Sequence, residues 1–295
     1  MGDFLCGYVA VAGRPNVGKS TLVNKLVSYP LSIISRKPQT TRHKVLGILG
    51  GEGYQVIFLD SPGLMAPKYA LQQMMVKTAW AAIEEADLVL LVTEPRPDDL
   101  EDETGVIAQL ARLKKPAILA INKIDLVDKA VLLPLIEAFG KIHPFKEIVP
   151  VSALKDDGLD VLKNLVISNL PHQPPFYPPG DVTDRPQKFF VGELIRQKVF
   201  ELYGEEVPYS VAVLVEEYKE REGAKDYIKA LVICEKSSQK AILIGKRGEA
   251  VKRLGRASRA AVEDFVGKSV FLELKVEVRE NWRREEQSVR QLGQT

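Results

Sequence analysis

Residues 13–20 have the sequence Gly-Arg-Pro-Asn-Val-Gly-Lys-Ser, and this stretch decides the fold that we expect. It fits the pattern G-x-x-x-x-G-K-[ST], a glycine-rich turn between a strand and a helix. The flanks agree, because the apolar run Tyr8–Ala12 precedes the turn and the amphipathic stretch Ser20–Val27 follows it. Exposed backbone N–H groups and the positive end of a helix together attract phosphate groups. A chance glycine-containing turn is the alternative, and the flanks disfavour it.

The side chains of this loop suit a nucleoside triphosphate. Gly13 and Gly18 permit backbone torsions and a close approach that a Cβ atom would prevent. We expect Lys19 to reach the β and γ phosphates, Ser20 to bind Mg²⁺ through its hydroxyl group, and Thr21 to bond the α-phosphate. The predicted phosphate-binding residues are Gly13, Arg14, Pro15, Asn16, Val17, Gly18, Lys19, Ser20 and Thr21.

Short apolar runs alternate with amphipathic stretches along the first 170 residues. The expected strands are Tyr8–Ala12, Gln55–Leu59, Leu88–Thr93, Ala117–Ile121 and Ile148–Val151. The expected helices are Ser20–Val27, Ala70–Glu85, Thr104–Leu113, Val131–Phe139 and Leu159–Asn169. This alternation predicts an α/β, doubly wound domain with a mostly parallel sheet. Ligands of such sheets bind outside the carboxyl ends of the strands.

Two loops that follow later strands predict a guanine site. In the segment Asn122-Lys-Ile-Asp, the Asp125 carboxylate can accept hydrogen bonds from N1–H and N2–H₂ of guanine, a donor pair that adenine lacks. The Lys123 stem can lie over the base, and Asn122 can tie this loop to the phosphate loop. Backbone N–H groups of Ser152-Ala153-Leu154 can bind the O6 atom of guanine.

The segment Asp60-Ser61-Pro62-Gly63 would pass for a plain turn, but its place among these motifs favours a nucleotide role. Asp60 would hold Mg²⁺ through water, and the Gly63 N–H group would contact the γ-phosphate. A threonine of the polar segment 37–43 would complete the Mg²⁺ shell. Thr40 and Thr41 both remain candidates, and we take Thr41. The candidate catalytic residues are Lys19, Thr41, Asp60 and Gly63, the candidate metal ligands are Ser20, Thr41 and Asp60, and Ser61, Pro62 and Leu64 join the GTP-binding set.

These motifs, in this order, resemble a translation-factor-like GTPase domain over residues 5–170. The resemblance implies hydrolysis of GTP to GDP and phosphate. Leu64 stands where Ras-like enzymes carry a glutamine that positions water, so we expect slow intrinsic turnover. Asn16, together with the loop that contains Thr41, resembles a K⁺ site of related bacterial GTPases, in which the ion supplies charge like an arginine finger.

The composition of the chain changes at residues 171–186, which include six prolines. Proline fixes φ and removes a donor, so we expect a semi-rigid linker. The predicted division is a GTPase domain at 1–172, a linker at 173–186 and a second domain at 187–295. The second domain is expected to be α+β, in the order helix Lys188–Tyr203, strands Ser210–Glu217 and Tyr227–Cys234, helices Gln239–Ile244 and Glu249–Phe265, and strand Val270–Val278.

The two middle helices of the second domain are joined by Gly245-Lys246-Arg247-Gly248. Residues 240–259 hold seven basic residues and one acidic residue, Glu249. This arrangement resembles a type II KH domain, whose G-x-x-G loop clamps about four nucleotides of single-stranded nucleic acid. A helix-turn-helix with a solvated basic face is the alternative. The predicted RNA-binding residues are Gly245, Lys246, Arg247, Gly248, Lys252, Arg253 and Arg256, and we expect the basic stretch Arg279–Arg284 to be a solvated tail.

A GTPase domain, a proline-rich linker and a carboxy-terminal KH domain together resemble the Era family of bacterial GTPases over nearly the whole chain. Glu193–Arg196 also looks like that family. The resemblance implies Mg²⁺ as cofactor, binding near the 3′ end of 16S rRNA, a role on the 30S subunit precursor and loose association with the inner membrane. One departure is Val92–Arg96, where the family usually has an aspartate after the strand, and we expect it to lie away from the motifs.

The composition agrees with a cytoplasmic protein of ordinary globular type. Hydrophobic residues make up 45% and charged residues 27%, the net charge is +2, and only two cysteines are present. No secretory leader and no run long enough to span a bilayer is recognised, and we expect a monomer. The main alternative is an RNA-binding scaffold in which the nucleotide is structural. A membrane-trafficking GTPase is disfavoured because neither terminus matches a lipidation pattern.

Overall fold

The computed structural model of the chain describes residues 4–35, 37–96 and 99–293, with the side chains of residues 99–104 left aside. The terminal residues of the lipidation patterns therefore lie partly outside the described residues. Two compact units are present. The first consists of Met1–Ser32, Thr41–Ala66 and Met75–Asp184, and the second consists of Ile33–Thr40, Pro67–Met74 and Arg185–Thr295.

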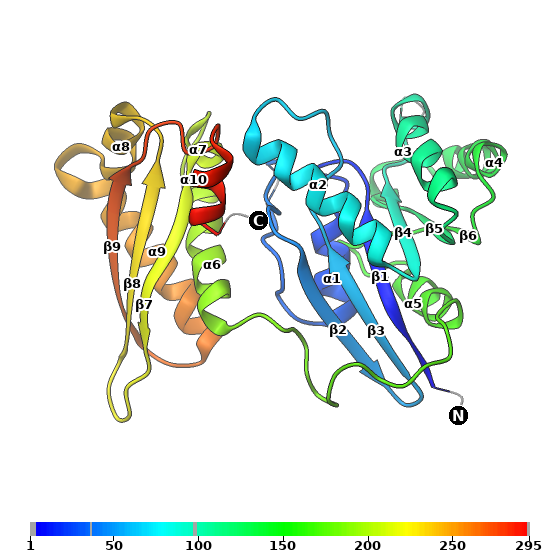
Figure 1. The fold of residues 1–295 in the computed structure, drawn as a ribbon, viewed down its shortest axis with the longest axis horizontal. Coiled ribbons are helices and arrows are strands. Elements are labelled where there is room, and N and C mark those ends of the chain that lie inside the picture. Colours follow the sequence, from blue (N-terminus) through cyan, green and yellow to red (C-terminus); the bar gives the residue numbers. More distant parts are fainter. Residues whose placement is uncertain (1–3, 36, 97–98, 294–295) are drawn as a thin grey trace. The chain divides into compact units, whose positions relative to one another are not determined.

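The first unit is built on a six-stranded sheet with the strand order β2-β3-β1-β4-β5-β6 (Figure 1). Only β2 runs antiparallel to its neighbour, so the prediction of a mostly parallel sheet is confirmed. The strands are β1 Leu5–Ala12, β2 Val45–Gly51, β3 Tyr54–Asp60, β4 Leu88–Thr93, β5 Ala117–Ile121 and β6 Glu147–Pro150.

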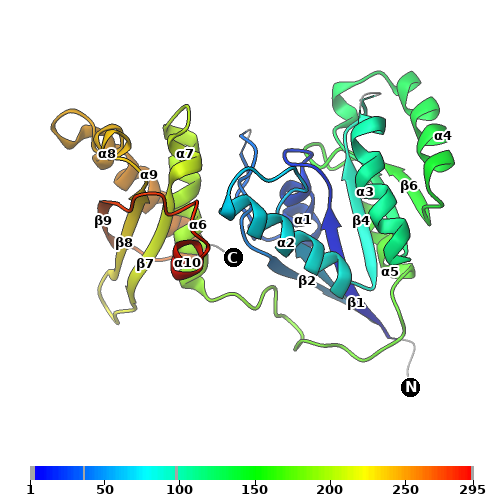
Figure 2. The ribbon, with the colours of Figure 1, turned by 45° about the horizontal axis from the view of Figure 1, so that its top comes forward.

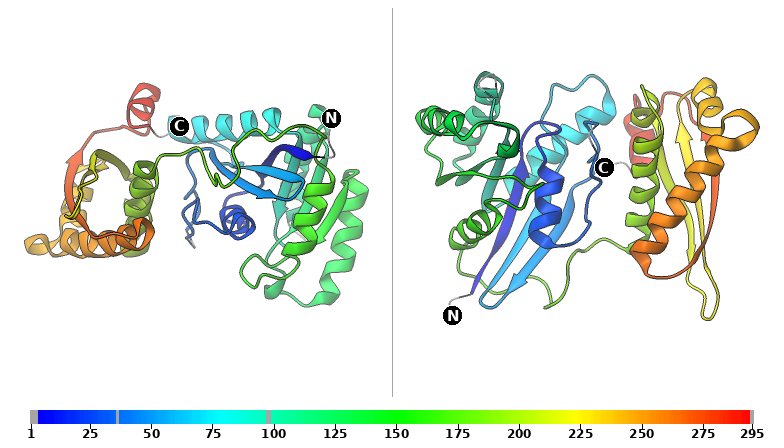
Figure 3. Two further views of the ribbon diagram at one scale, coloured as in Figure 1. Left: turned by 90° about the horizontal axis from the view of Figure 1, so that it is seen from below. Right: turned by 180° about the vertical axis from the view of Figure 1, so that it is seen from behind.

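Helices cover both faces of this sheet, as the doubly wound prediction requires. Figure 3 shows α1 (Lys19–Val27) and α5 (Leu159–Ser168) on one face, and α2 (Ala70–Glu85) and α3 (Asp99–Leu113) on the other. The apolar side chains beneath α2 and α3 form one buried cluster, to which α4 (Leu132–Ile142) adds Leu135 and Phe139. Two short 3₁₀ turns, Ile124–Leu126 and Lys129–Val131, precede α4.

Strand β2 is the element that the sequence pattern missed. Its sequence, VLGILGG, contains three glycines, which lower strand propensity and break the alternation of apolar side chains. It forms nonetheless because it pairs along its whole length with β3, from Val45 opposite Asp60 to Gly51 opposite Tyr54. The start of α3 was also misplaced, since the helix begins at Asp99 and not at Thr104.

The proline-rich segment lies along the first unit without forming a helix or strand. The Gln55 side chain, which is 4% exposed, accepts hydrogen bonds from the N–H groups of Phe176 and Tyr177 at 2.9 and 3.0 Å. The backbone of Val182 accepts a hydrogen bond from Ile48 at 2.9 Å. The boundary between the two compact units falls after Asp184.

The second unit has a three-stranded sheet (Figure 2), and α6 (Gln187–Leu202) and α9 (Glu249–Val266) lie side by side on one face of it (Figure 3). Strands β7 (Ala212–Lys219) and β8 (Asp226–Cys234) are antiparallel, whereas β8 and β9 (Val270–Val278) are parallel. The helices are α6 Gln187–Leu202, α7 Val207–Ser210, α8 Ser237–Ile244, α9 Glu249–Val266 and α10 Glu286–Gln291. Apart from the short α7 and α10, this is the predicted α-β-β-α-α-β order, and the α+β prediction is confirmed.

The stretch Arg279–Arg284 is not a solvated tail, so that expectation is wrong. Trp282 is 0% exposed, and its Nε1 donates a hydrogen bond to the Ser210 carbonyl at 2.9 Å. Next to it, the Arg283 guanidinium forms an ion pair with Glu235. The large apolar area of the indole ring, rather than the charge of its neighbours, decides where this segment lies.

Neither cysteine forms a disulfide, and both Cys6 and Cys234 are buried. Within the described residues, every helix is too short or too polar to cross a lipid bilayer.

Candidate functional site

The predicted phosphate loop joins β1 to α1 in a conformation that only small residues allow. Gly13 has φ +136°, and a Cβ atom there would lie 2.2 Å from the Val92 carbonyl oxygen. Gly18 has φ +96°, and a Cβ atom there would lie 2.3 Å from Asn122 Nδ2. Gly18 is also the N-cap of α1 and has no side chain to bond the helix N–H groups, which leaves them available to an anion.

Lys19 lies within the loop and is 6% exposed. Its ammonium group donates hydrogen bonds to the carbonyl oxygens of Gly13 and Arg14 at 3.1 and 2.8 Å. A buried lysine ammonium in a glycine loop at the start of a helix suits the β and γ phosphates of a nucleotide.

The Asp60 carboxylate, at the end of β3, is fully buried, and neither of its oxygens has a hydrogen-bond partner among the described residues. Burial raises the pKa of this carboxyl group above its ordinary value, while the Ser32 hydroxyl and the Lys19 ammonium act in the opposite direction. A buried carboxylate without a partner is unfavourable unless a cation is bound. This observation fits a site for a metal ion.

Besides the two oxygens of the Asp60 carboxylate, two hydroxyl oxygens of the same unit lie close together. Ser20 Oγ and Thr41 Oγ1 are 2.8 Å apart, and Thr41 is 9% exposed. Mg²⁺ prefers oxygen ligands, usually one or two carboxylates together with hydroxyl groups, water and substrate phosphates. The donors Ser20, Thr41 and Asp60 match that set. By contrast, the described residues contain no cluster of three or more His, Cys, Asp or Glu side chains that would hold a metal without such a substrate.

The segment Asp60–Leu64 packs directly against the phosphate loop. The Leu64 N–H group donates to the Gly13 carbonyl at 3.0 Å, and the Ser61 hydroxyl donates to the Val11 carbonyl at 3.1 Å. A Cβ atom on Gly63 would lie 2.6 Å from the backbone nitrogen of Pro15. Leu64 is itself buried at 6% exposure, so it packs into the core.

Asn122 joins the base loop to its neighbours. Its Nδ2 donates to the Val17 carbonyl at 2.9 Å, and its Oδ1 accepts from the Ala153 N–H group at 3.0 Å. Its own backbone N–H group donates to the Thr93 carbonyl at 2.8 Å. A single side chain, 2% exposed, therefore ties the loops after β1, β5 and β6 together.

The other members of the predicted guanine site surround Asn122. Lys123 has φ +66°, and its ammonium donates to the Asn16 carbonyl at 2.6 Å. The Ser152 hydroxyl donates to Asp125 Oδ1, which holds that carboxylate beside Ala153 and Leu154. A carboxylate and a lysine stem thus come from one edge of the sheet. Of the predicted O6 donors, the Ser152 N–H group donates to the Asp157 carbonyl at 2.9 Å and the Ala153 N–H group donates to Asn122.

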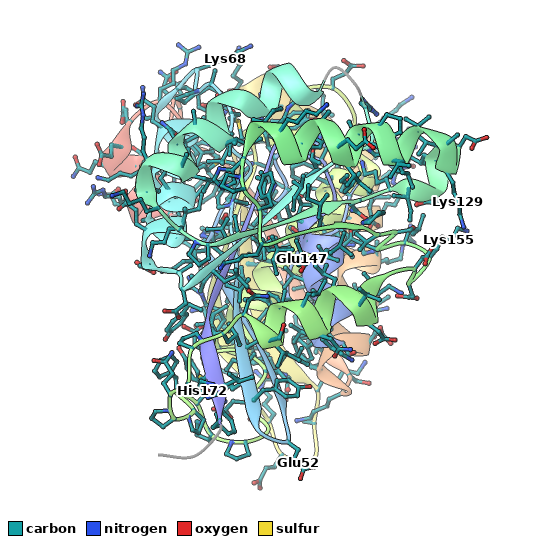
Figure 4. All side chains as sticks on the ribbon, turned by 90° about the vertical axis from the view of Figure 1, so that its right-hand side faces the viewer. Glu52, Lys68, Lys129, Glu147, Lys155 and His172 are labelled. Carbon is teal, nitrogen blue, oxygen red and sulfur yellow. The ribbon has the colours of Figure 1, made fainter. Side chains whose placement is uncertain are left out.

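Figure 4 shows which end of the first unit this is. Lys155 follows the predicted base loop and lies well apart from Glu52 and His172. Glu52 forms the turn between β2 and β3, and His172 pairs with the first residue of β1, so both mark the amino ends of β1 and β3. The predicted site is at the carboxyl edge, where parallel α/β sheets bind their ligands.

The predicted RNA-binding loop has the backbone of a phosphate clamp. Gly245, Arg247 and Gly248 all have positive φ, at 70°, 52° and 75°. A Cβ atom on Gly248 would meet no heavy atom within 4 Å, so the backbone there is open to a ligand. Lys246 and Arg247 are exposed at the tip of the loop.

Helix α9, which follows this loop, has one buried side and one exposed basic side. Leu254, Ser258 and Val262 form its buried side at a spacing of four residues. The cations of the opposite side, all exposed, are Lys252, Arg253, Arg256 and Arg259. The predicted RNA-binding residues therefore lie in the loop before α9 and on the exposed side of that helix.

Two contacts join the predicted switch segment, residues 37–43, to α6, and neither was assigned from sequence. Lys37 donates to the Phe200 carbonyl at 2.6 Å, in the last turn of α6, where the helix dipole is negative. Arg196 is 1% exposed, pairs with Glu193 at 2.6 Å and donates to the Thr40 carbonyl. Thr40, the other magnesium candidate, is held here by its carbonyl oxygen.

Comparison with known families agrees with both halves of the chain. A family described as 50S ribosome-binding GTPase matches residues 8–123, and a family described as KH domain matches residues 206–283. GTPase Era of Geotalea uraniireducens is 43% identical over 99% of this chain and 98% of that protein. GTPase Era of Ruminiclostridium cellulolyticum is 40% identical over the same shares of both chains.

Two solved structures match at full length. One is a variant of Era from Aquifex aeolicus bound to GDP·AlF₄⁻, with 40% identity, a TM-score of 0.92 and coverage of 99% of this chain and 100% of that chain. The other is Era in complex with MgGDPNP and nucleotides 1506–1542 of 16S ribosomal RNA, with 40% identity, a TM-score of 0.93 and coverage of 99% of each chain.

The contact between Gly63 and the phosphate loop gives a first prediction. Gly63→Ala would place a methyl group against the Pro15 backbone, which cannot move like a flexible side chain. We expect a loss of about 1–3 kcal/mol in the free energy of unfolding. We also expect at least a tenfold lower rate of GTP hydrolysis, because the two loops are forced apart. Urea titration and phosphate release measure the two effects.

Gly105→Ala is the matched control. Gly105 lies within α3, and a Cβ atom there would meet nothing within 4 Å. The substitution should leave hydrolysis unchanged and raise stability by up to about 1 kcal/mol. Equal rates of hydrolysis and equal stabilities of the two variants would contradict the packing argument.

Proposed function

The chain belongs to the Era family of GTPases, and from this membership we propose that it is a GTP-driven switch that binds 16S rRNA near its 3′ end and assists assembly of the small ribosomal subunit. The family and the two matching domains establish a GTPase joined to a KH domain. The observation that carries the proposal is the way Asn122 connects the phosphate loop with both base loops, while a second, separate glycine loop carries exposed cations.

The nucleotide site works by position and charge. Backbone N–H groups of residues 13–20 and Lys19 hold the phosphates, Asp125 selects guanine, and Gly63 contacts the γ-phosphate. Phosphoryl transfer needs little covalent chemistry from the protein, because its transition state is stabilised chiefly by fixed charges and correct placement. The burial of Lys19 and Asp60 keeps water from screening those charges.

Mg²⁺ fits the donors of this site. Ser20, Thr41 and Asp60 would hold the ion, which would neutralise charge on the β and γ phosphates. The support is the buried Asp60 carboxylate, whose oxygens have no partner among the described residues, and the short distance between the Ser20 and Thr41 hydroxyls.

Thr41 and Thr40 form a natural pair of test variants. Thr41→Ala should lower Mg²⁺-dependent GTP hydrolysis by about tenfold or more, the order of loss found when a metal site loses a supporting contact. Thr40→Ala should have little effect, because Thr40 is held through its carbonyl oxygen, which the substitution keeps. Single-turnover hydrolysis across a Mg²⁺ titration measures both. A larger loss in Thr40→Ala would reverse the assignment.

Leu64 cannot orient the attacking water, so the backbone, another loop or a cation must place it. We propose K⁺ bound by Asn16, whose side chain is exposed at the mouth of the phosphate loop. Asn16 has φ +71°, and its carbonyl accepts a hydrogen bond from Lys123, so the side-chain amide is the group that would bind the ion.

Hydrolysis rates in KCl and NaCl test this step. We expect K⁺ to raise the rate about tenfold or more, since arginine fingers in comparable places contribute larger factors. Asn16→Gly keeps the positive φ without strain and removes the amide oxygen, so it should abolish the difference between the two salts. Equal rates in both salts for the unaltered protein would exclude a potassium site.

The second unit binds RNA in this proposal through the loop Gly245–Gly248 and the basic side of α9. Backbone phosphates would approach the glycines while Lys246, Arg247, Lys252, Arg253 and Arg256 neutralise them. The Era structure solved with nucleotides 1506–1542 of 16S ribosomal RNA supports this choice of partner. The family resemblance alone supports three further parts of the proposal. These are the 30S precursor as the assembly substrate, a monomeric state, and a cytoplasmic location with loose attachment to the inner membrane.

The switch segment provides a route from nucleotide to RNA. Arg196 and Lys37 fix residues 37–40 against α6. Thr41, the next residue, contacts Ser20 of the phosphate loop. If binding of GTP moves Thr41, the preceding residues 37–40, which are hydrogen-bonded to α6, must therefore move or strain those hydrogen bonds. This argues against a scaffold in which the nucleotide is only structural.

Gly248→Asp tests the RNA site. It adds negative charge where phosphates would lie, and we expect at least tenfold weaker binding of a single-stranded RNA with the 16S rRNA 3′ sequence, since one lost phosphate contact and one added repulsion each weaken binding. Gly267→Asp is the matched control, because Gly267 also has φ near +70° and open space, but ends α9.

Binding is measured in GDP and in a non-hydrolysable GTP analogue, together with hydrolysis in a single turnover. An unchanged affinity for Gly248→Asp in both states would place the RNA elsewhere. A rate of hydrolysis that RNA does not change would favour the scaffold.

A further inference from the structure

Glu94 contacts Lys123 of the predicted base loop, although the sequence placed the segment Val92–Arg96 away from the motifs. That expectation is wrong. Glu94 is the first residue after β4, and β4 lies between β1 and β5 in the sheet (Figure 1). The loops after β1 and β5 carry the phosphate loop and the base loop, so a side chain after β4 is positioned to reach both.

The Glu94 carboxylate has two cationic partners on opposite sides. One oxygen forms an ion pair and hydrogen bond with the Lys123 ammonium, and the other lies 3.0 Å from the Arg96 guanidinium. The exposed fraction of the Glu94 side chain is 10%, that of Lys123 is 28% and that of Arg96 is 67%. The pair with Lys123 is therefore the better shielded of the two, and the Arg96 pair is largely screened by water.

Lys123 makes one further hydrogen bond, to the Asn16 carbonyl at 2.6 Å. Its ammonium group thus bridges Glu94 and the phosphate loop. A lysine stem that lies over a base must be held at its end, because four rotatable bonds otherwise leave it many conformations. Glu94 and the Asn16 carbonyl together supply two acceptors that fix this end.

We propose that Glu94 is a positioning residue of the guanine-nucleotide site, which holds Lys123 so that its stem is preorganised over the base and its ammonium stays on Asn16. This inference rests on the proposed role of Lys123 in base binding. The effect lies in nucleotide binding: Glu94 acts through Lys123, whose proposed contact is with the base, and GDP and GTP share that base, so both should gain equally.

The charge of Glu94, rather than its shape, is the property that acts here. Glu94→Gln keeps the length and an acceptor oxygen but removes the negative charge, and a hydrogen bond to a charged partner is the stronger kind. Loss of this charged hydrogen bond at a partly shielded site should weaken the binding of both GDP and a non-hydrolysable GTP analogue by roughly tenfold. Glu94→Asp, which keeps the charge on a shorter stem, should recover a large part of the affinity.

The experiment is calorimetry with unlabelled GDP and the GTP analogue on the full-length chain in Mg²⁺. The variants are Glu94→Gln, Lys123→Met and the two combined. Because Glu94 acts through Lys123, the double variant should bind no more weakly than Lys123→Met alone. Circular dichroism and thermal melting confirm that each variant is folded.

Two controls separate this role from a general structural one. Glu85→Gln removes the same charge from a 2.6 Å pair with Lys44 in which the Glu85 side chain is 56% exposed, and it should leave nucleotide affinity unchanged. Arg96→Ala removes the other partner of Glu94 and should weaken binding by less than twofold. A loss in Arg96→Ala equal to that in Glu94→Gln would assign the effect to the local loop and overturn the proposal.

The remaining outcomes are also decisive. If Lys123→Met weakens binding but Glu94→Gln does not, Glu94 has no positioning role while the proposed guanine site stands. Additive losses in the double variant would show that Glu94 acts through something other than Lys123. If Lys123→Met itself binds both nucleotides normally, the role of Lys123 in base binding fails, and the inference about Glu94 fails with it.

Discussion

The nucleotide site depends on one buried amide, that of Asn122. It donates to the Val17 carbonyl and accepts from the Ala153 N–H group, so it sets the distance between the phosphate loop and the proposed base loop. Gly18 is required by the same contact, because a Cβ atom there would collide with Asn122 Nδ2. Each hydrogen bond contributes about 1 kcal/mol, but a buried group left without its partner costs more. The loops after β1, β5 and β6 therefore keep one arrangement, because any other would leave the Asn122 amide without its hydrogen-bond partners.

The same site contains buried charged side chains that oppose folding of the protein when no ligand is bound. Lys19 and Asp60 are both nearly or fully buried, and burial raises the pKa of the Asp60 carboxyl group. Isolated buried charges oppose folding, and a bound cation and phosphates would remove that cost. The first unit accordingly gives up stability at residues that we propose bind the nucleotide, as is common at sites built for function.

The sequence predicted the strands that are buried on both faces, because Leu88–Thr93 and Ala117–Ile121 are uninterrupted apolar runs. It missed β2, whose glycines hide its pattern and which forms through pairing with β3. The motifs placed Asp60, Asn122 and Asp125 on the correct edge. The sequence could not choose between Thr40 and Thr41, since only the fold brings one hydroxyl to Ser20. Glu94 and Trp282 were misjudged for the same reason, as their partners are distant in the chain.

The two units have related loops that suit phosphate but differ in burial. Gly18 and Gly248 are both N-caps in the left-handed region, and neither offers a side chain to the helix that follows, so the N–H groups at both helix starts remain for an anion. The cation beside Gly18 is the buried Lys19, whereas the cations beside Gly248 are exposed. Exposed charges are screened over about 8 Å at physiological salt, and buried ones much less. The first loop is thus suited to one tightly held nucleotide, and the second to a long polyanion that must bind and leave.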